Sequence, residues 1–196
     1  MSTMSAAITL FLIMDPLGNV PIFLNALERV DPARQKTVLI RELLIAYVIL
    51  CFFLFFGGYL LTLMGLRTES ISVGGGIVLF LIAIKMIFPS PANLRPANNP
   101  DEEPFIVPLA IPSVAGPSTM ASLVIMAKTQ PGQMLGWFTA LTGAWVVSSM
   151  ILLASPFIFK ILKKRGLIAV ERLMGMILVA LSVQLFLDGI SQYLTK

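Results

Sequence analysis

The 196-residue sequence has no histidine, a single cysteine and few charged residues. Without histidine, the chain lacks the commonest metal ligand and the side chain that titrates most readily near neutral pH. With Cys51 as its only cysteine, an intrachain disulfide is excluded, and the apolar neighbours of Cys51 favour a packing role. Charged residues make up 12% of the chain, whereas a soluble domain has roughly a quarter. These absences argue against a soluble domain, and we expect no catalytic residue, metal site or cofactor.

What the sequence has instead is long apolar runs, with 57% hydrophobic residues and a mean hydropathy of +0.91. A bilayer is spanned by about 20 apolar residues in a helix. Backbone groups in hydrocarbon need internal partners, so we expect an all-α integral membrane protein with six transmembrane helices. The six predicted runs are 4–27, 39–64, 71–88, 105–128, 134–159 and 167–193.

The basic residues favour one orientation in the membrane. Ten lie in or beside the connections after the first, third and fifth runs, and three lie on the other side. Because cytoplasmic loops carry an excess of Lys and Arg, the larger group is expected in the cytoplasm and both termini outside. The larger group is Arg29, Arg34, Lys36, Arg41, Arg95, Lys160, Lys163, Lys164, Arg165 and Arg172, and the smaller is Arg67, Lys128 and Lys196.

A spacing of prolines recurs in the two halves of the chain. The first run contains Pro16 and Pro21, and the fourth contains Pro112 and Pro117, 96 positions later. The third run reads "GIVLFLIAIKMIF" and the sixth reads "GMILVALSVQLFL", at an offset of 99. Three helices in each half place the halves in opposite orientations. The sequence therefore predicts two inverted three-helix repeats, 1–88 and 105–196, joined by a polar loop, 89–104.

The four prolines predict that helices 1 and 4 are discontinuous. Proline removes a backbone donor and clashes with the carbonyl four residues earlier, so each pair is expected to unwind a turn. An unwound turn inside the membrane must be buried in protein or line a cavity. The half-helix after each break presents unpaired N–H groups and a partial positive charge, which suit a carboxylate.

The polar residues at the two breaks are the candidate substrate ligands. In the first run, Asp15 can accept from an ammonium group, and Asn19 can both donate and accept. In the fourth run, Gly116 permits close approach and the two hydroxyls that follow it can donate. A small zwitterion such as an amino acid satisfies both kinds of group. The predicted substrate-binding residues are Asp15, Gly18, Asn19, Ser113, Gly116, Ser118 and Thr119.

A purely structural interpretation of the same residues stays open. Asp15 followed by Pro16 is also the pattern of an ordinary helix start, with aspartate at the N-cap and proline at the first helical position. The sequence does not decide whether Asp15 contacts a substrate or caps the half-helix. Elsewhere, we expect Lys85 to reach the lipid headgroups, and Glu42 and Glu171 to be hydrated at helix ends.

The segments "MDPLGNVPIFL" and "PLAIPSVAGPSTMASL" strongly resemble the MarC family of bacterial inner-membrane proteins, also known as SnatA or NAAT neutral amino acid transporters and UPF0056. The resemblance covers almost the whole chain, is strongest to the YhgN-like subgroup, and extends to the LysE-like superfamily of six-helix proteins. It implies transport of small neutral amino acids such as glycine and alanine. By motif, it also implies that the residues of the two segments form two central breaks.

Together, these patterns predict a secondary transporter of small neutral amino acids in the bacterial inner membrane, working by alternating access as an antiporter or symporter. Coupling to H⁺ or Na⁺ is open, and without histidine a proton would use Asp15. The expected partners are the small-molecule substrate and membrane lipid, with a homo-oligomer open and nucleic acid excluded. The alternatives are an exporter of other metabolites or drugs, a channel and an intramembrane enzyme. For the enzyme, no suggestive nucleophile–base spacing is present.

Overall fold

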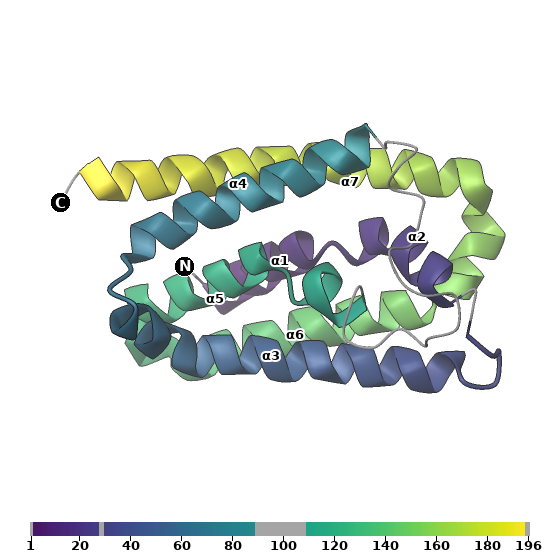
Figure 1. Ribbon diagram of the computed structural model, residues 1–196, viewed down its shortest axis with the longest axis horizontal. Helices are drawn as coiled ribbons and strands as arrows, with labels where there is room; N and C mark the ends of the chain where they lie inside the picture. The colour runs from purple at the N-terminus through teal and green to yellow at the C-terminus, as the bar shows by residue number, and fades with distance from the viewer. Residues whose placement is uncertain (1, 28–29, 89–108, 195–196) are drawn as a thin grey trace.

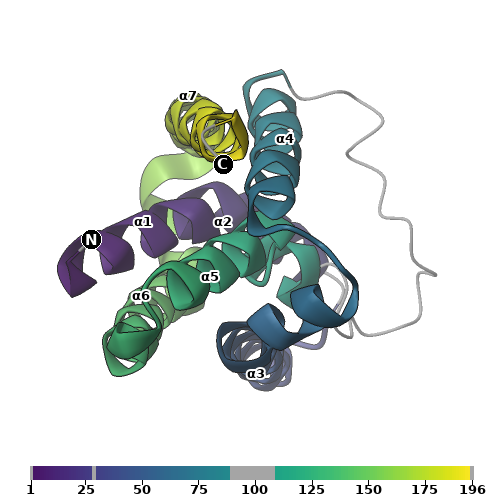
Figure 2. The same ribbon diagram turned by 90° about the vertical axis from the view of Figure 1, so that its left-hand side faces the viewer.

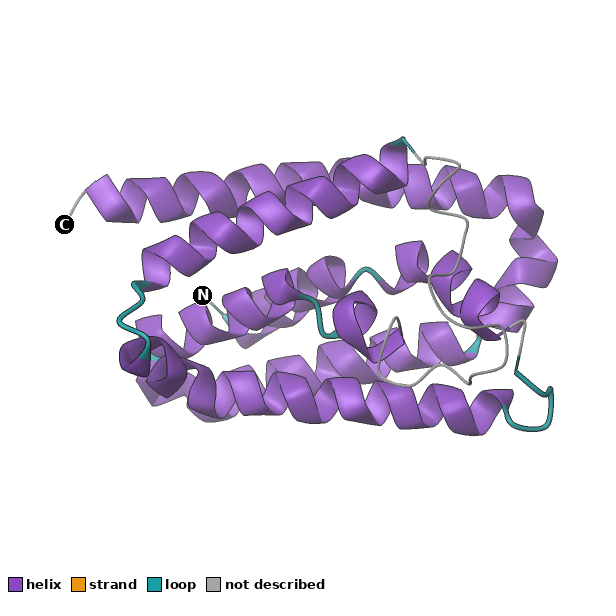
Figure 3. Cartoon of the chain, viewed as in Figure 1, coloured by secondary structure: helices purple, strands orange, loops and turns teal. Residues whose placement is uncertain are grey.

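The computed structural model describes residues 2–27, 30–88 and 109–194, and every regular element among them is a helix (Figure 3). The predicted connecting loop, 89–104, and Arg29, Arg95 and Lys196 lie outside the described residues. The elements are α1 (Thr3–Met14), α2 (Pro16–Leu27), α3 (Gln35–Leu63), α4 (Thr68–Ile87), the π-helix η2 (Leu109–Val114), α5 (Pro117–Thr129), the 3-10 turn η3 (Pro131–Gln133), α6 (Met134–Leu153) and α7 (Ser155–Leu194).

Five segments of the described chain are long and apolar enough to cross a membrane. They are Thr3–Leu24, Gln35–Leu63, Thr68–Ile87, Pro131–Leu153 and Arg165–Leu194. The predicted fourth run does not form one long helix, because η2 is followed by a break and α5 has only 13 residues. The structure therefore confirms an all-α integral membrane architecture among the described residues, with five of the six predicted spans as candidate crossings.

The predicted end of the fifth run is wrong. The fifth run was expected to continue to residue 159, but α6 ends at Leu153 and the chain turns at Ala154 before α7 begins. Within α7, Lys163 has φ 52° and ψ −178°, so its first turns point away from the long segment that follows. Because the side chains in this first part of α7 are apolar, the hydrophobic pattern of the sequence continues across the turn, although the helix axis changes direction there.

The core of the bundle lies between α1, α3, α5 and α6. Leu10, Leu50, Leu123 and Leu141, one from each of these helices, are fully buried. Large apolar side chains on the outside are exposed, among them Val48, Phe56 and Tyr59 of α3. Burying them against lipid removes apolar surface from water, as burial in a core does for a soluble protein. The core-facing side and the lipid-facing side of a helix are therefore both apolar. This is why each helix appears in the sequence as one continuous apolar run.

The helices pack in pairs that correspond between the two halves of the chain. α4 and α7 run along each other (Figures 1 and 2), α1 lies on α6 as η2 lies on α3, and α2 lies on α7 as α5 lies on α4. The pieces of the two interrupted segments also meet, with α2 against η2 and α1 against α5. The two breaks are thus carried by segments that touch one another inside the bundle. The start of α1 and the end of α7 lie at the same end of it (Figure 1).

Small residues bring α4 and α7 close together. A Cβ atom added at Gly76 would lie 2.9 Å from the carbonyl oxygen of Ser182, and one at Gly175 would lie 3.1 Å from that of Ala83. Leu79 and Leu178, which the sequence repeat pairs with each other, are buried in the same small cluster. Glycine at these positions permits the close backbone approach that is typical of packed membrane helices.

Candidate functional site

The first break is a single residue between α1 and α2. α1 ends at Met14, Asp15 has the left-handed conformation (φ 43°, ψ 61°), and α2 begins at Pro16. A proline disfavours the α conformation in the residue before it. Aspartate is one of the few residues other than glycine that tolerate a left-handed conformation. The Asp15–Pro16 pair therefore interrupts the helix at one position, and no full turn is unwound.

Asp15 satisfies backbone groups on both sides of the first break. Its N–H donates to the carbonyl oxygens of Phe11 and Leu12, at 3.1 and 3.2 Å. Its carboxylate Oδ1 accepts from the N–H of Gly18 at 3.1 Å, and the side chain is buried. This is the geometry of an N-cap residue, with Pro16 at the first helical position. The structure shows Asp15 in the capping role that the sequence had left open beside substrate contact.

Gly18 and Asn19 lie inside α2 and contact residues at the first break. A Cβ atom at Gly18 would overlap Asp15 Oδ2 and Met86 Cε, so a larger residue there would force the carboxylate and the Met86 side chain to shift. The Nδ2 of Asn19 donates to the carbonyl oxygen of Met14 at 2.9 Å and thereby satisfies the last turn of α1. The prediction that Gly18 lies in an unwound turn is wrong, because Asp15 caps α2 and the helix has already begun at Pro16, two residues earlier.

Pro21 is not at a break. It lies inside α2, and the helix continues to Leu27. Because Pro21 has no N–H, the carbonyl of Leu17 loses its usual helical donor. Two prolines were expected to unwind the chain between them, but Pro16 stands at the first helical position, where its missing donor costs nothing. Only one of the two prolines therefore marks the first break.

The second break lies between η2 and α5. The N–H of Ala115 donates to the carbonyl oxygen of Ala110 at 2.9 Å and closes the π-helical turn. Gly116 is extended (φ −78°, ψ 155°), and α5 begins at Pro117. Pro112 lies within η2 and does not end it, contrary to its predicted role as a helix breaker. The side chains of Pro112 and Ser113 lie outside the described part of the structure.

The start of α5 is buried and lacks a side-chain cap. Gly116 occupies the N-cap position and has no side chain to accept from the first turn. Ser118 and Thr119, in the first turn of α5, are 2% and 1% exposed. Ser122, one turn further along α5, is buried, and its hydroxyl has no hydrogen-bond partner among the described residues. A buried helix start with unpaired donors needs a partner from outside the helix.

α4 covers this end of α5 with glycine. A Cβ atom at Gly75 would lie 2.9 Å from Cβ of Ala121 and 3.7 Å from Cα of Ser118. The close approach leaves little free space beside Ser118. The sequence predicted Ser118 and Thr119 as ligands but missed Ser122 and Gly75. The spacing of four residues between Ser118 and Ser122 was the available signal, because residues four apart share a helix face.

The two breaks correspond at different residues from those predicted. In both, a proline occupies the first helical position of the second piece, so Pro16 corresponds to Pro117. Asp15 then corresponds to Gly116, and Gly18 to Thr119. The spacing of the four prolines suggested Pro16 with Pro112 and Pro21 with Pro117, which is wrong because it compares a helix interior with a helix start. One break therefore has a carboxylate where the other has none.

Comparison with known proteins agrees with this membrane architecture. The model of the MarC family of integral membrane proteins matches residues 1–194. The chain belongs to the MarC family. The inner membrane protein YhgN of Escherichia coli K12 is 49% identical over 190 residues, covering 97% of this chain and 96% of the relative. A membrane protein of Buchnera aphidicola (subspecies Baizongia pistaciae) is 49% identical over 191 residues, covering 96% of each.

A more distant relative is archaeal. A membrane protein of Methanocaldococcus jannaschii is 32% identical over 194 residues, covering 93% of this chain and 84% of the relative. No solved structure matches the chain. These relatives carry only UPF0056 membrane-protein names, which assign a location and no activity. This MarC-family chain is accordingly an integral inner-membrane protein.

Two carboxylates of the MarC-family chain differ from expectation or were missed. Glu42 was expected to be hydrated, but it is fully buried and pairs with Arg41 at 2.9 Å. Glu69 is 4% exposed in the first turn of α4 and was not singled out. Lys85 is exposed near the end of α4, as expected. Glu171 of α7 is half-buried and acts electrostatically on Asp15, which places a second acidic side chain near the first break.

Proposed function

We propose that this MarC-family protein is a secondary transporter of small neutral amino acids, such as glycine and alanine, and not an enzyme. The observation that carries the proposal is the buried, uncapped start of α5. Three hydroxyls lie buried there, on Ser118, Thr119 and Ser122, and that of Ser122 has no partner among the described residues. A buried polar group without a partner is costly. A ligand that supplies acceptors at this place removes that cost.

The substrate's carboxylate is proposed to bind at the start of α5. The N–H groups of the first turn and the positive end of the helix dipole favour an anion there. Ser118 and Thr119 add two hydroxyl donors, and Gly116 lets the carboxylate approach the backbone. The close approach of Gly75 to Ala121 favours a substrate with a small side chain. Glycine and alanine fit this combination of charge and size.

Asp15 has a different part in the proposal. Its Oδ1 caps α2 through Gly18, and its second oxygen is the acceptor proposed for the substrate's ammonium group. A coupling ion, H⁺ or Na⁺, would act at the same carboxylate, with Glu171 as the nearby second charge. Asp15 thus fixes the shape of the first break and, in the proposal, contributes one acceptor to the site.

Alternating access is proposed to come from two inverted three-helix repeats, with six transmembrane segments and both termini in the periplasm. Support comes from the helix contacts, which correspond in pairs when the halves are exchanged. In transporters of this kind, the substrate site lies between discontinuous helices near the midplane, and one repeat moves against the other. Because Ser118 and Thr119 are buried, a helix packed against α5, such as α4, must move to admit a substrate.

The proposal is tested by counterflow of radiolabelled glycine in proteoliposomes, across the twenty amino acids and with or without ion gradients. Ser118→Ala and Thr119→Val are expected to lower the rate of counterflow at least tenfold, because a hydrogen bond to a charged group contributes about 1.5–3 kcal/mol. The matched control is Thr62→Val, since Thr62 is on an exposed face and its hydroxyl donates to the carbonyl of Gly58 in its own helix.

Three results would point elsewhere. Normal counterflow by both α5 variants would place the site away from the second break. Counterflow by none of the twenty amino acids, with transport of another metabolite or drug, would favour the exporter alternative. Flux that does not saturate with substrate concentration would indicate a channel.

A further inference from the structure

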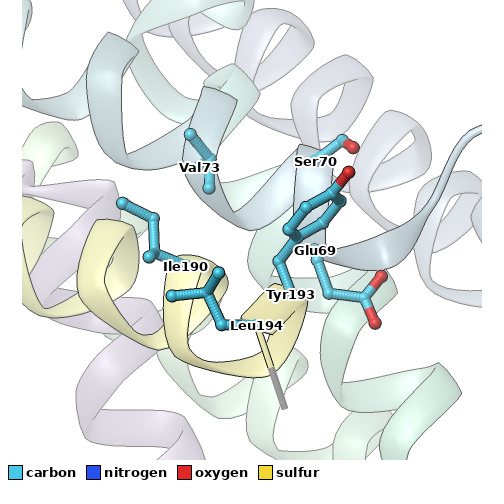
Figure 4. Close-up of a pocket in the computed structure, with 6 residues that line it drawn as sticks. All are labelled: Glu69, Ser70, Val73, Ile190, Tyr193 and Leu194. Carbon is cyan, nitrogen blue, oxygen red and sulfur yellow. The ribbon is translucent and has the colours of Figure 1, made fainter. Parts of the chain in front are cut away.

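Two cavities lie between α4 and α7. One, of about 310 Å³, is at the end of the bundle that holds Arg67, and Figure 4 shows the side chains of the two helices around it. The other, of about 270 Å³, lies further along the same helices and is lined by apolar residues that include Ile77, Phe80, Val183 and Phe186. Neither contains a residue of the proposed substrate site.

The two cavities follow one another along α4 and α7, and together they are here called the α4–α7 groove. On α4 the lining positions include Ser70, Val73, Ile77 and Leu81, and on α7 they include Val183, Phe186, Ile190 and Leu194. The steps are three or four residues on both helices, so each set occupies one face. From Ser70 to Leu81 the helix rises about 16 Å, which is about half of the roughly 30 Å hydrocarbon thickness. The groove therefore has the depth of one membrane leaflet.

The two ends of the groove differ in polarity. At the polar end, Arg67 lies 3.7 Å from a carboxylate oxygen of Glu69, and its guanidinium carbon is 4.6 Å from the centre of the Tyr193 ring. The side chain of Arg67 is half exposed, whereas that of Glu69 is buried. Beyond these residues the groove is bordered by exposed apolar side chains such as Ile77 and Val183. One cationic and one anionic side chain thus lie at the polar end of an otherwise apolar groove.

We propose that the α4–α7 groove binds one phospholipid whose headgroup carries an ammonium group. The phosphate binds Arg67, because a guanidinium donates to phosphate oxygens in a matching fork geometry. The ammonium binds the carboxylate of Glu69, and one acyl chain lies along Ile77, Phe80 and Val183. An uncharged glycerol headgroup offers no ammonium group to Glu69, and a soluble zwitterion does not fill the apolar length of the groove.

Native mass spectrometry of the purified protein with equimolar phosphatidylethanolamine, phosphatidylcholine and phosphatidylglycerol tests the proposal. The expected result is one retained phosphatidylethanolamine per protein, in preference to the other two lipids. Arg67→Gln is expected to lower its occupancy about tenfold, since bonds to charged groups contribute about 1.5–3 kcal/mol. Glu69→Gln is expected to abolish the preference for the ethanolamine headgroup. The matched control is Lys128→Gln, an exposed basic residue at the end of α5 that lies outside the groove.

A second variant blocks the apolar part of the groove without touching the charges. Val183 is 44% exposed, so Val183→Trp fills the groove from the lipid side and is expected to displace the acyl chain while the protein stays monodisperse. Equal retention of all three lipids, or unchanged occupancy in Arg67→Gln, would overturn the proposal. Competition by soluble phosphoethanolamine would assign the charges to a soluble ligand, and a dimer that Val183→Trp disrupts would assign the groove to a second copy.

Discussion

The two breaks in the bundle look alike in sequence and differ in structure. At the first, Asp15 and Asn19 satisfy the ends of α1 and α2 from within the chain. At the second, Gly116 leaves the start of α5 without a side-chain cap, although the neighbouring hydroxyls are buried. The difference shows that a helix interruption marked by proline can have its backbone groups satisfied within the chain, as at the first break, or can lack a side-chain cap, as at the second. The residue before the proline makes this difference: it is aspartate at the first break and glycine at the second.

The largest effect on the comparison is expected at Gly18. Gly18→Ala places a methyl group against the Asp15 carboxylate and Met86, so the first break must shift or open. Overpacking of this kind typically lowers the free energy of unfolding by about 1–3 kcal/mol. Thermal unfolding in detergent measures it, with Gly74→Ala as the control, since no neighbouring atom lies within 4 Å of a Cβ there. Equal unfolding midpoints in the two variants would show that Asp15 is not held against α2.

A somewhat smaller effect is expected at Asp15. Asp15→Ala removes the cap of α2 and leaves the buried N–H of Gly18 without its acceptor, which costs about 1–2 kcal/mol. Asp15→Asn keeps a capping oxygen and is expected to restore most of this stability. Glycine counterflow by the stable Asp15→Asn variant then separates the two roles. Loss of transport indicates ammonium binding or ion coupling, and full transport indicates capping alone.

The smallest of the three effects is expected at Asn19. Asn19→Ala removes the hydrogen bond to the carbonyl of Met14, which contributes about 1 kcal/mol. Because the bond ties α2 to the end of α1, the two pieces are expected to move more freely about Asp15. Amide hydrogen exchange in the last turn of α1 is expected to speed up by up to about tenfold. Unchanged exchange there would mean that Asp15 alone holds the first break.

Much of the fold could be predicted from the sequence. The apolar runs of α3 and α4 are bounded by polar residues, and their predicted ranges lie within a few residues of the observed helices. The turn at Ala154 was missed because the residues on both sides of it are apolar and only Pro156, in the first turn of α7, marks a new helix. Hydropathy reports the surroundings of a segment and says little about a change in its direction.

At the candidate site, the sequence identified the residues better than their roles. Asp15, Asn19, Ser118 and Thr119 are all at or beside the breaks, as predicted. Which proline begins a helix could not be read from spacing, because Pro21 is accommodated inside α2 once Asp15 has capped its start. The burial of Ser118 depends on Gly75 of a different helix, and such a contact is set by tertiary packing.

The most direct test of the difference between the breaks is to give the second break the cap of the first. Gly116→Asp places a carboxylate at the N-cap of α5, where we propose that the substrate's carboxylate binds. The account predicts that glycine counterflow in proteoliposomes is lost while the unfolding midpoint is retained or raised. Glycine counterflow at the wild-type rate, in a variant of unchanged stability, would contradict it.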